Sequence, residues 1–184
     1  MVLKRLICRS NLNATFETVM KILSLLFVFL CTAGHNYELP VIRQKYVNAA
    51  ISQLSADTFH ESFESVTADH DNTTLVAYKA ASMVLLAKYE DGVFSKMRFF
   101  NQGKKLLEAT IKKAPDNYEA RLIRFNIQDN VPWITGYTSN IKEDKTFLIK
   151  HFGKQPEDLK VFTQKYILQC DAFSPKEKAV FKLN

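Results

Sequence analysis

The side chains best suited to hold a metal ion lie between residues 60 and 71 of this 184-residue chain. His60 and Glu64 are four residues apart, so a helix would place them on one face. A structural or catalytic metal site takes at least three protein ligands, and this pair supplies only two. The run from Asp69 to Asp71 is more simply explained as a polar loop that leads into the helix-capping residue Asn72. We therefore predict no metal site.

Nucleophilic chemistry would have to come from Cys170, because Cys8 and Cys31 belong to an N-terminal segment that we expect to be removed. A single remaining cysteine excludes an intramolecular disulfide in the mature chain. Cys170 continues a stripe at helical spacing that begins with Leu159 and includes Tyr166, which is typical of a core face. We predict a buried, unreactive thiol.

Sequence motifs for catalysis and cofactor binding are missing. The chain has no G-x-S-x-G, no phosphate-binding glycine loop, no H-E-x-x-H and no paired cysteines. We predict a protein without enzymatic activity, without a cofactor and without catalytic residues.

One connecting segment is unusually apolar and is the candidate binding site. Residues 130–137 read NVPWITGY, whereas loops between helices are ordinarily polar and exposed. The segment either folds down as a lid on the core or exposes an apolar patch that meets a partner. We favour the lid, since a proline and a glycine bracket its apolar centre. If the patch is exposed instead, its binding residues are Val131, Pro132, Trp133, Ile134 and Tyr137.

The elements that must position these residues are predicted to be helices. Glycine is rare, and apolar residues recur at spacings of three and four rather than two. Thr73 to Tyr89 is apolar nearly all round and is expected in the middle of a bundle. Lys96 to Ala114 is amphipathic, with Met97, Phe100 and Leu107 on its buried side. The other predicted helices are 35–54, 57–66, 116–128, 140–152, 156–170 and 175–182.

Capping residues mark three of these helix starts. Asp116 with Glu119, Asn140 with Glu143, and Ser174 with Glu177 each have the spacing of a reciprocal capping box. A fourth start, at Pro156, combines a first-turn proline with two acidic residues.

The N-terminus has the layout of a secretory signal peptide. Lys21 precedes an apolar run, Ile22–Leu30, in which Ser24 is the one polar residue, and small residues follow as far as Gly34. The run is shorter than the about 20 residues of a membrane-spanning helix. We therefore expect cleavage after Ala33 or Gly34 and export to the periplasm or beyond.

The expected organisation is an N-terminal extension with signal peptide, residues 1–34, followed by a single domain, residues 35–184. Either Met1 or Met20 is the true start. The whole chain carries a net charge of +6, and removal of four basic residues and one acidic residue with the leader leaves +3. This charge gives little support to nucleic-acid binding, which we do not expect.

Counted back from Pro115, the residues Gly103, Leu107 and Thr110 have the spacing of the second helix of a tetratricopeptide repeat. Only one such unit is visible, and Arg121 and Arg124 stand where the next helix would carry apolar residues. The sequence thus resembles one tetratricopeptide-like hairpin.

A wider resemblance covers residues 75–152, with the runs AYKAASMVLLAKY, FFNQGKKLLEATIKKAPDNYEARLIRFNIQDNVPWITGY and NIKEDKTFLIKHF. These are similar to a family of small exported helical proteins of Bacteroidota-type bacteria that is related to tetratricopeptide repeats. The resemblance implies the fold and export, and it transfers no catalytic residue.

These observations predict an all-α protein, a compact bundle of about seven helices with one tetratricopeptide-like hairpin. We expect it to act as a protein-interaction or scaffold module, with a protein partner and no membrane span after signal cleavage. The alternative is a binder of a small apolar ligand between helices, which the fourteen phenylalanines suggest.

Overall fold

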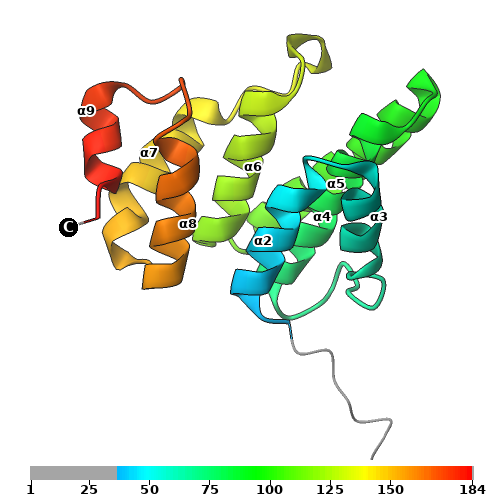
Figure 1. Ribbon diagram of the computed structural model, residues 1–184, viewed down its shortest axis with the longest axis horizontal. Helices are drawn as coiled ribbons and strands as arrows, with labels where there is room; N and C mark the ends of the chain where they lie inside the picture. Colours follow the sequence, from blue (N-terminus) through cyan, green and yellow to red (C-terminus); the bar gives the residue numbers. More distant parts are fainter. Residues whose placement is uncertain (1–36, 184) are drawn as a thin grey trace, which may run out of the picture. The chain divides into compact units, whose positions relative to one another are not determined.

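The computed structural model describes residues 37–183, and residues 38–184 form one compact unit. Within the described part, every regular element is helical: eight α-helices and three short 3-10 helices (Figure 1). The prediction of an all-α compact bundle is confirmed. The predicted leader, residues 1–34, lies outside the described residues, so signal cleavage and export stay predictions.

Two short helices begin the unit. Helix α2 (Leu39–Ala49) carries Pro40 in its first turn, where a proline is well tolerated. Helix α3 (Gln53–Glu61) starts at Ser52, whose hydroxyl accepts a backbone N–H of the first turn. The predicted boundary between residues 54 and 57 is therefore wrong, because the Ser52 cap starts the second helix earlier.

The α4–α5 hairpin lies at the centre of the unit. Helix α4 (Thr73–Tyr89) has the predicted bounds, and the Asn72 side chain caps it by accepting two backbone N–H groups. It contacts α2, α3, α5 and α6, which confirms its predicted central place. Helix α5 (Val93–Lys113) begins three residues before the predicted start at Lys96.

Gly103 allows α4 and α5 to approach each other closely. A Cβ at this position would lie 2.5 Å from the carbonyl oxygen of Ala80 and 2.8 Å from a methyl group of Val84. Only a residue without a side chain fits there. The glycine therefore sets the distance between the two longest helices.

The second half of the unit packs around α6 (Tyr118–Asn130). It comprises α7 (Ile141–His151), α8 (Glu157–Ile167), the short α9 (Pro175–Lys178), and the 3-10 helices η1 (Trp133–Thr135), η2 (Phe152–Lys154) and η3 (Ala179–Phe181). Their shared core is aromatic and aliphatic, and its buried members are Tyr118, Leu122, Phe125, Leu148, Phe152, Leu159, Ile167, Cys170, Phe173 and Phe181.

Two of the three predicted capping boxes are absent. Asn117, not Asp116, caps α6, and its side chain accepts the N–H of Ala120. Glu119 points inward to an arginine instead of back to the helix start. Asn140 makes no capping bond to the backbone, and its side-chain oxygen accepts hydrogen bonds from Gln128 and Ser139 instead. Glu143 is held by Arg121.

The capping box of Ser174 and Glu177 is present as predicted. The Glu177 carboxylate also receives the Lys145 ammonium at 2.9 Å, and these contacts lower the pKa of Glu177 to about 2.

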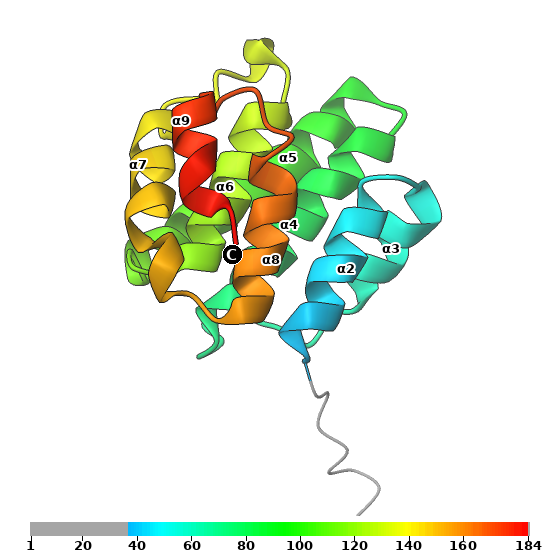
Figure 2. The same ribbon diagram turned by 60° about the vertical axis from the view of Figure 1, so that its left-hand side comes forward.

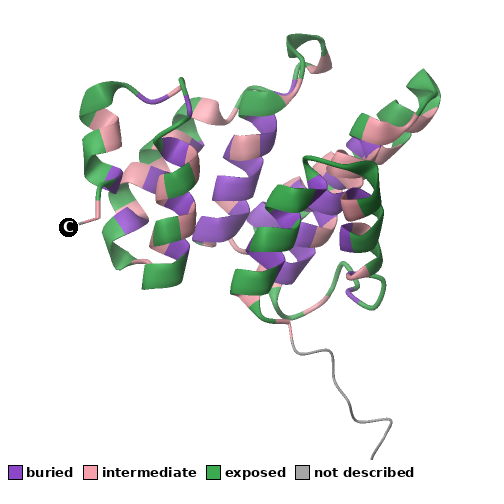
Figure 3. Cartoon of the chain, viewed as in Figure 1, coloured by how far each residue is buried: buried purple, intermediate pink, exposed green. Residues whose placement is uncertain are grey.

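Helix α6 is buried along most of its length, while the far end of the α4–α5 hairpin and the η1 loop are exposed (Figure 3). No helix among residues 37–183 combines the length and the apolar character that a bilayer-spanning segment requires.

Candidate functional site: the loop between α6 and α7

The loop between α6 and α7 presents its central residues to solvent. The side chain of Trp133 is 86% exposed and that of Ile134 is 78% exposed. Both belong to η1, a turn that projects away from α6 (Figure 1). The predicted lid is therefore wrong for these two residues, because η1 carries them outward instead of back over the core.

Tyr137 is the residue of this loop that closes on the bundle. It is buried, and its ring packs edge-on against Phe100 of α5 with the ring centroids 6.0 Å apart. The Lys104 ammonium lies 4.8 Å from the centre of the same ring. The Tyr137 hydroxyl donates a hydrogen bond to Glu108. The contact that we predicted for the tryptophan is thus made by the tyrosine.

The backbone holds Trp133 and Ile134 in a defined turn. The N–H of Thr135 donates to the carbonyl of Pro132 at 3.0 Å, and the N–H of Gly136 donates to that of Trp133 at 3.0 Å. Gly136 has a φ of 61°, the left-handed conformation that favours glycine. Before the turn, Val131 is half-buried and Pro132 is exposed. The exposed residues therefore lie on a turn that is closed by two backbone hydrogen bonds.

A buried ion cluster fixes the acceptor of Tyr137. Arg124 of α6 donates to both carboxylate oxygens of Asp144, each at 2.7 Å, and to Glu108 at 2.9 Å. Arg121 adds a bond to Asp144 at 3.0 Å. Burial and the hydrogen bond to Glu108 raise the pKa of Tyr137, so its hydroxyl stays a donor. The cluster links α5, α6 and α7 at the base of the loop.

Glu108 and Asp144 support this loop, and neither was predicted to do so from the sequence. Arg121 and Arg124 were the available indication, since two arginines replace expected apolar residues on one helix. Buried arginines require carboxylate partners, but their identity depends on which helices become neighbours.

A second buried cluster joins α2, α4, α6 and α8. Arg43 donates to Glu119 at 2.7 and 2.9 Å and to Asp158 at 2.7 Å. The Tyr78 hydroxyl donates to the same Glu119. The side chains of Arg43 and Glu119 are each 5% exposed. Every carboxylate here already has internal donors, so the cluster is a structural tie between helices.

His60 and Cys170, the other side chains considered for chemistry, also contact partners within the protein. His60 lies 2.8 Å through Nδ1 from the Ser82 hydroxyl, but Ser82 is fully buried and donates to a backbone carbonyl of its own helix. Burial raises the pKa of the Cys170 thiol, which contacts Asp129 at 3.1 Å. The predicted buried thiol is confirmed. Among residues 37–183, no three His, Cys, Asp or Glu side chains group closely enough to hold a metal ion.

Comparison of the chain with protein-family models, with curated proteins and with solved structures gives no match.

Proposed function

We propose that this domain is a non-enzymatic protein-interaction module whose contact surface is the η1 loop. The observation that carries the proposal is the 86% exposure of Trp133 on a turn that is hydrogen-bonded on both sides. Burial of this exposed indole against a partner would contribute favourable free energy to binding.

Rigidity favours this use of the loop. Tryptophan is enriched among the residues that contribute most to protein interfaces. A side chain on a fixed backbone loses less conformational entropy on binding than one on a mobile segment. Tyr137 anchors the loop to the bundle, while Trp133 and Ile134 would contact the partner, with Pro132 beside them.

The partner that fits this surface is a protein with an apolar pocket that accepts the indole. A hydrogen-bond acceptor at the pocket rim would satisfy the indole N–H. The alternative of a small apolar ligand between the helices stays a prediction. Within the described residues, Tyr46, Phe59 and Tyr78 contact one another in the core.

A photo-crosslinking residue at position 134, introduced into the protein in its native cells, tests the proposal. We expect one discrete crosslinked protein, and its loss when Trp133→Ala is added. The matched control places the same residue at Val41, which is 48% exposed on α2. No adduct at position 134, or an adduct that Trp133→Ala leaves unchanged, would contradict the proposal.

A further inference from the structure

Two turns expose large apolar side chains at one end of the unit. The α2–α3 turn and the start of α3 present Ile51, 76% exposed, and Leu54, 78% exposed. The start of α5 presents Val93, 72% exposed, and Phe94, 94% exposed. These four residues are called the turn surface below.

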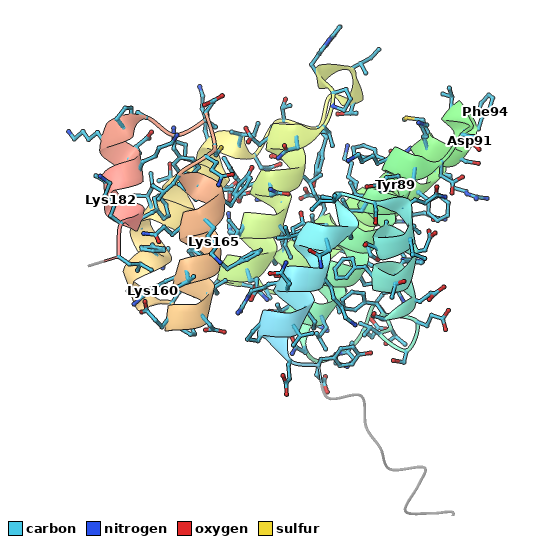
Figure 4. All side chains as sticks on the ribbon, in the orientation of Figure 1. Tyr89, Asp91, Phe94, Lys160, Lys165 and Lys182 are labelled. Carbon is cyan, nitrogen blue, oxygen red and sulfur yellow. The ribbon has the colours of Figure 1, made fainter. Side chains whose placement is uncertain are left out.

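The two turns are joined by hydrogen bonds from the end of α4. The Lys88 ammonium donates to the carbonyl of Ala50 at 2.7 Å, and the Tyr89 hydroxyl donates to that of Ala49 at 3.2 Å. Both turns lie at the same end of the unit in both views (Figures 1 and 2). Figure 4 shows Phe94 at the outer end of the hairpin, with Tyr89 nearer the helical body.

Apolar character continues from the turn surface along the hairpin. Met97, predicted on the buried side of α5, is 45% exposed. Residues Met83–Leu86 of α4 are only half-buried. The reason is that the end of the hairpin extends beyond the neighbouring helices, so there is nothing to cover its apolar side chains (Figure 3).

Basic residues predominate beside this end of the hairpin. Between residues 88 and 105 there are five basic side chains, Lys88, Lys96, Arg98, Lys104 and Lys105, and two acidic ones, Glu90 and Asp91. Arg98 follows Phe94 by four residues, so it lies on the same outer face of α5 one turn further from the tip. The tip exposes Val93 and Phe94 beside the acidic Asp91 (Figure 4), and positive charge predominates on the flank behind it.

We propose that the turn surface docks on the interface of an anionic lipid bilayer. Exposed apolar side chains at a convex tip can enter the boundary between headgroups and acyl chains, where amphipathic helices with basic polar faces also bind. Of the basic side chains behind the tip, Lys96 and Arg98 are the ones that can reach anionic headgroups, and their long stems can extend to that level. A second copy of this chain is disfavoured because the two flanks would bring like charges together.

This inference goes beyond the proposed protein-interaction role and uses different residues. The η1 loop lies at the same end of the unit as the turn surface (Figure 1). A domain docked in this way would meet the protein partner of Trp133 at the bilayer surface. The experiments distinguish failure of one proposal from failure of the other, because Trp133 and Ile134 remain unchanged in the turn-surface variants.

The test uses residues 38–184, a compact unit whose core is formed by its own helices, without the apolar N-terminal run. Co-sedimentation is measured with vesicles of one part phosphatidylglycerol to two parts phosphatidylcholine, and with phosphatidylcholine alone. We expect binding to the anionic vesicles that weakens with added salt. Phe94→Ser with Leu54→Ser should lower the partition coefficient about tenfold or more. Lys96→Gln with Arg98→Gln should lower it about fivefold for each charge removed.

The matched control is Val41→Ser, an exposed valine on the first turn of α2, away from the turn surface. We expect it to bind like the unchanged unit, and circular dichroism should show all variants folded. The proposal is overturned if anionic vesicles do not sediment the unit, or if Phe94→Ser with Leu54→Ser binds normally. It is also overturned if Val41→Ser causes the same loss, or if only Trp133→Ser abolishes binding.

Discussion

At the scale of single residues, the buried charges are ties between helices that are far apart in the chain. Arg43 links α2 to α6 and α8, while Arg124 links α6 to α5 and α7. In both clusters, burial by itself would lower the pKa of the arginine, but the carboxylate partners outweigh it and raise the pKa. Both guanidinium groups therefore stay charged at any pH at which the protein is folded.

Asp144 is the member of its cluster whose substitution should lower the free energy of unfolding most. Its side chain is fully buried and receives bonds from two arginines. Asp144→Asn should lower the free energy of unfolding by about 3–5 kcal/mol, because it leaves buried positive charge without its partner. Glu143→Gln is the control, since that side chain is 58% exposed, and we expect about 1 kcal/mol or less. Urea unfolding measures both, and equal effects would contradict this account.

Asp158 should make stability depend on acid pH. The hydrogen bond from Arg43 lowers the pKa of Asp158 in the folded state. Its stabilisation is therefore complete above the unfolded pKa of about 3.9 and is lost as the pH falls through the lower folded pKa. The side chain is 48% exposed, so we expect about 1 kcal/mol or less. The difference in unfolding free energy between the unchanged protein and Asp158→Asn should shrink below about pH 4. A constant difference down to pH values near the folded pKa would rule this out.

Trp133 should contribute little to stability. A lid that buried Trp133 would make its truncation strongly destabilising, but the residue is 86% exposed. Trp133→Ala should change the free energy of unfolding by no more than about 0.5 kcal/mol. As the single tryptophan of the chain, it should be quenched by iodide almost as freely in the native protein as in urea. A blue-shifted, protected emission would contradict the exposed loop.

At the scale of elements, the α4–α5 hairpin depends on Gly103. Alanine there would meet a backbone oxygen at 2.5 Å, which the helix cannot easily move away. Although alanine favours helix by about 1 kcal/mol over glycine, the clash should dominate and destabilise the protein by about 1–3 kcal/mol.

Gly153→Ala is the control for Gly103→Ala, because nothing lies within 4 Å of a Cβ at residue 153. We expect that variant to stay within about 0.5 kcal/mol of the unchanged protein. Thermal unfolding of both variants measures the difference. A neutral Gly103→Ala would mean that α4 and α5 can separate without loss.

At the scale of the whole unit, α6 joins the two halves. Leu122 and Phe125 belong to the C-terminal core, while Asn126 accepts the Tyr46 hydroxyl of α2 at 2.6 Å. Neither half keeps its buried surface without this helix. We therefore expect residues 38–184 to unfold in one transition, with coincident urea curves from far-ultraviolet and near-ultraviolet circular dichroism. Two separated transitions would show that the halves are independent.

Much of the fold was predictable because local interactions specify it. The bounds of α4 follow from Asn72 and a largely apolar stretch, and the cap of α9 follows from Ser174 and Glu177. In the other two predicted boxes the cap residue differs or has another partner: Asn117 caps α6 in place of Asp116, and Asn140 accepts from the side chains of Gln128 and Ser139. Glu119 and Glu143 are bound by arginines that only the packing of helices brought within reach.

In the candidate loop, too, some features follow from the local sequence and others from the packing of helices. Its composition identifies residues 130–137 as unusual from the sequence alone, and Pro132 and Gly136 bracket the apolar centre. Which aromatic residue faces the core was not determined locally. Tyr137 is buried because Phe100 and Glu108 of α5 receive its ring and its hydroxyl, so Trp133 is left outside.

The sequence by itself determined the helical class, the central place of α4 and the burial of Cys170, because spacing and capping act within a few residues along the chain. Only the tertiary structure decided which carboxylates pair with Arg43 and Arg124. It also decided that η1 and the start of α5 project from the bundle. Those outcomes depend on which helices become neighbours and where their ends extend past one another, and residues distant in the chain determine both.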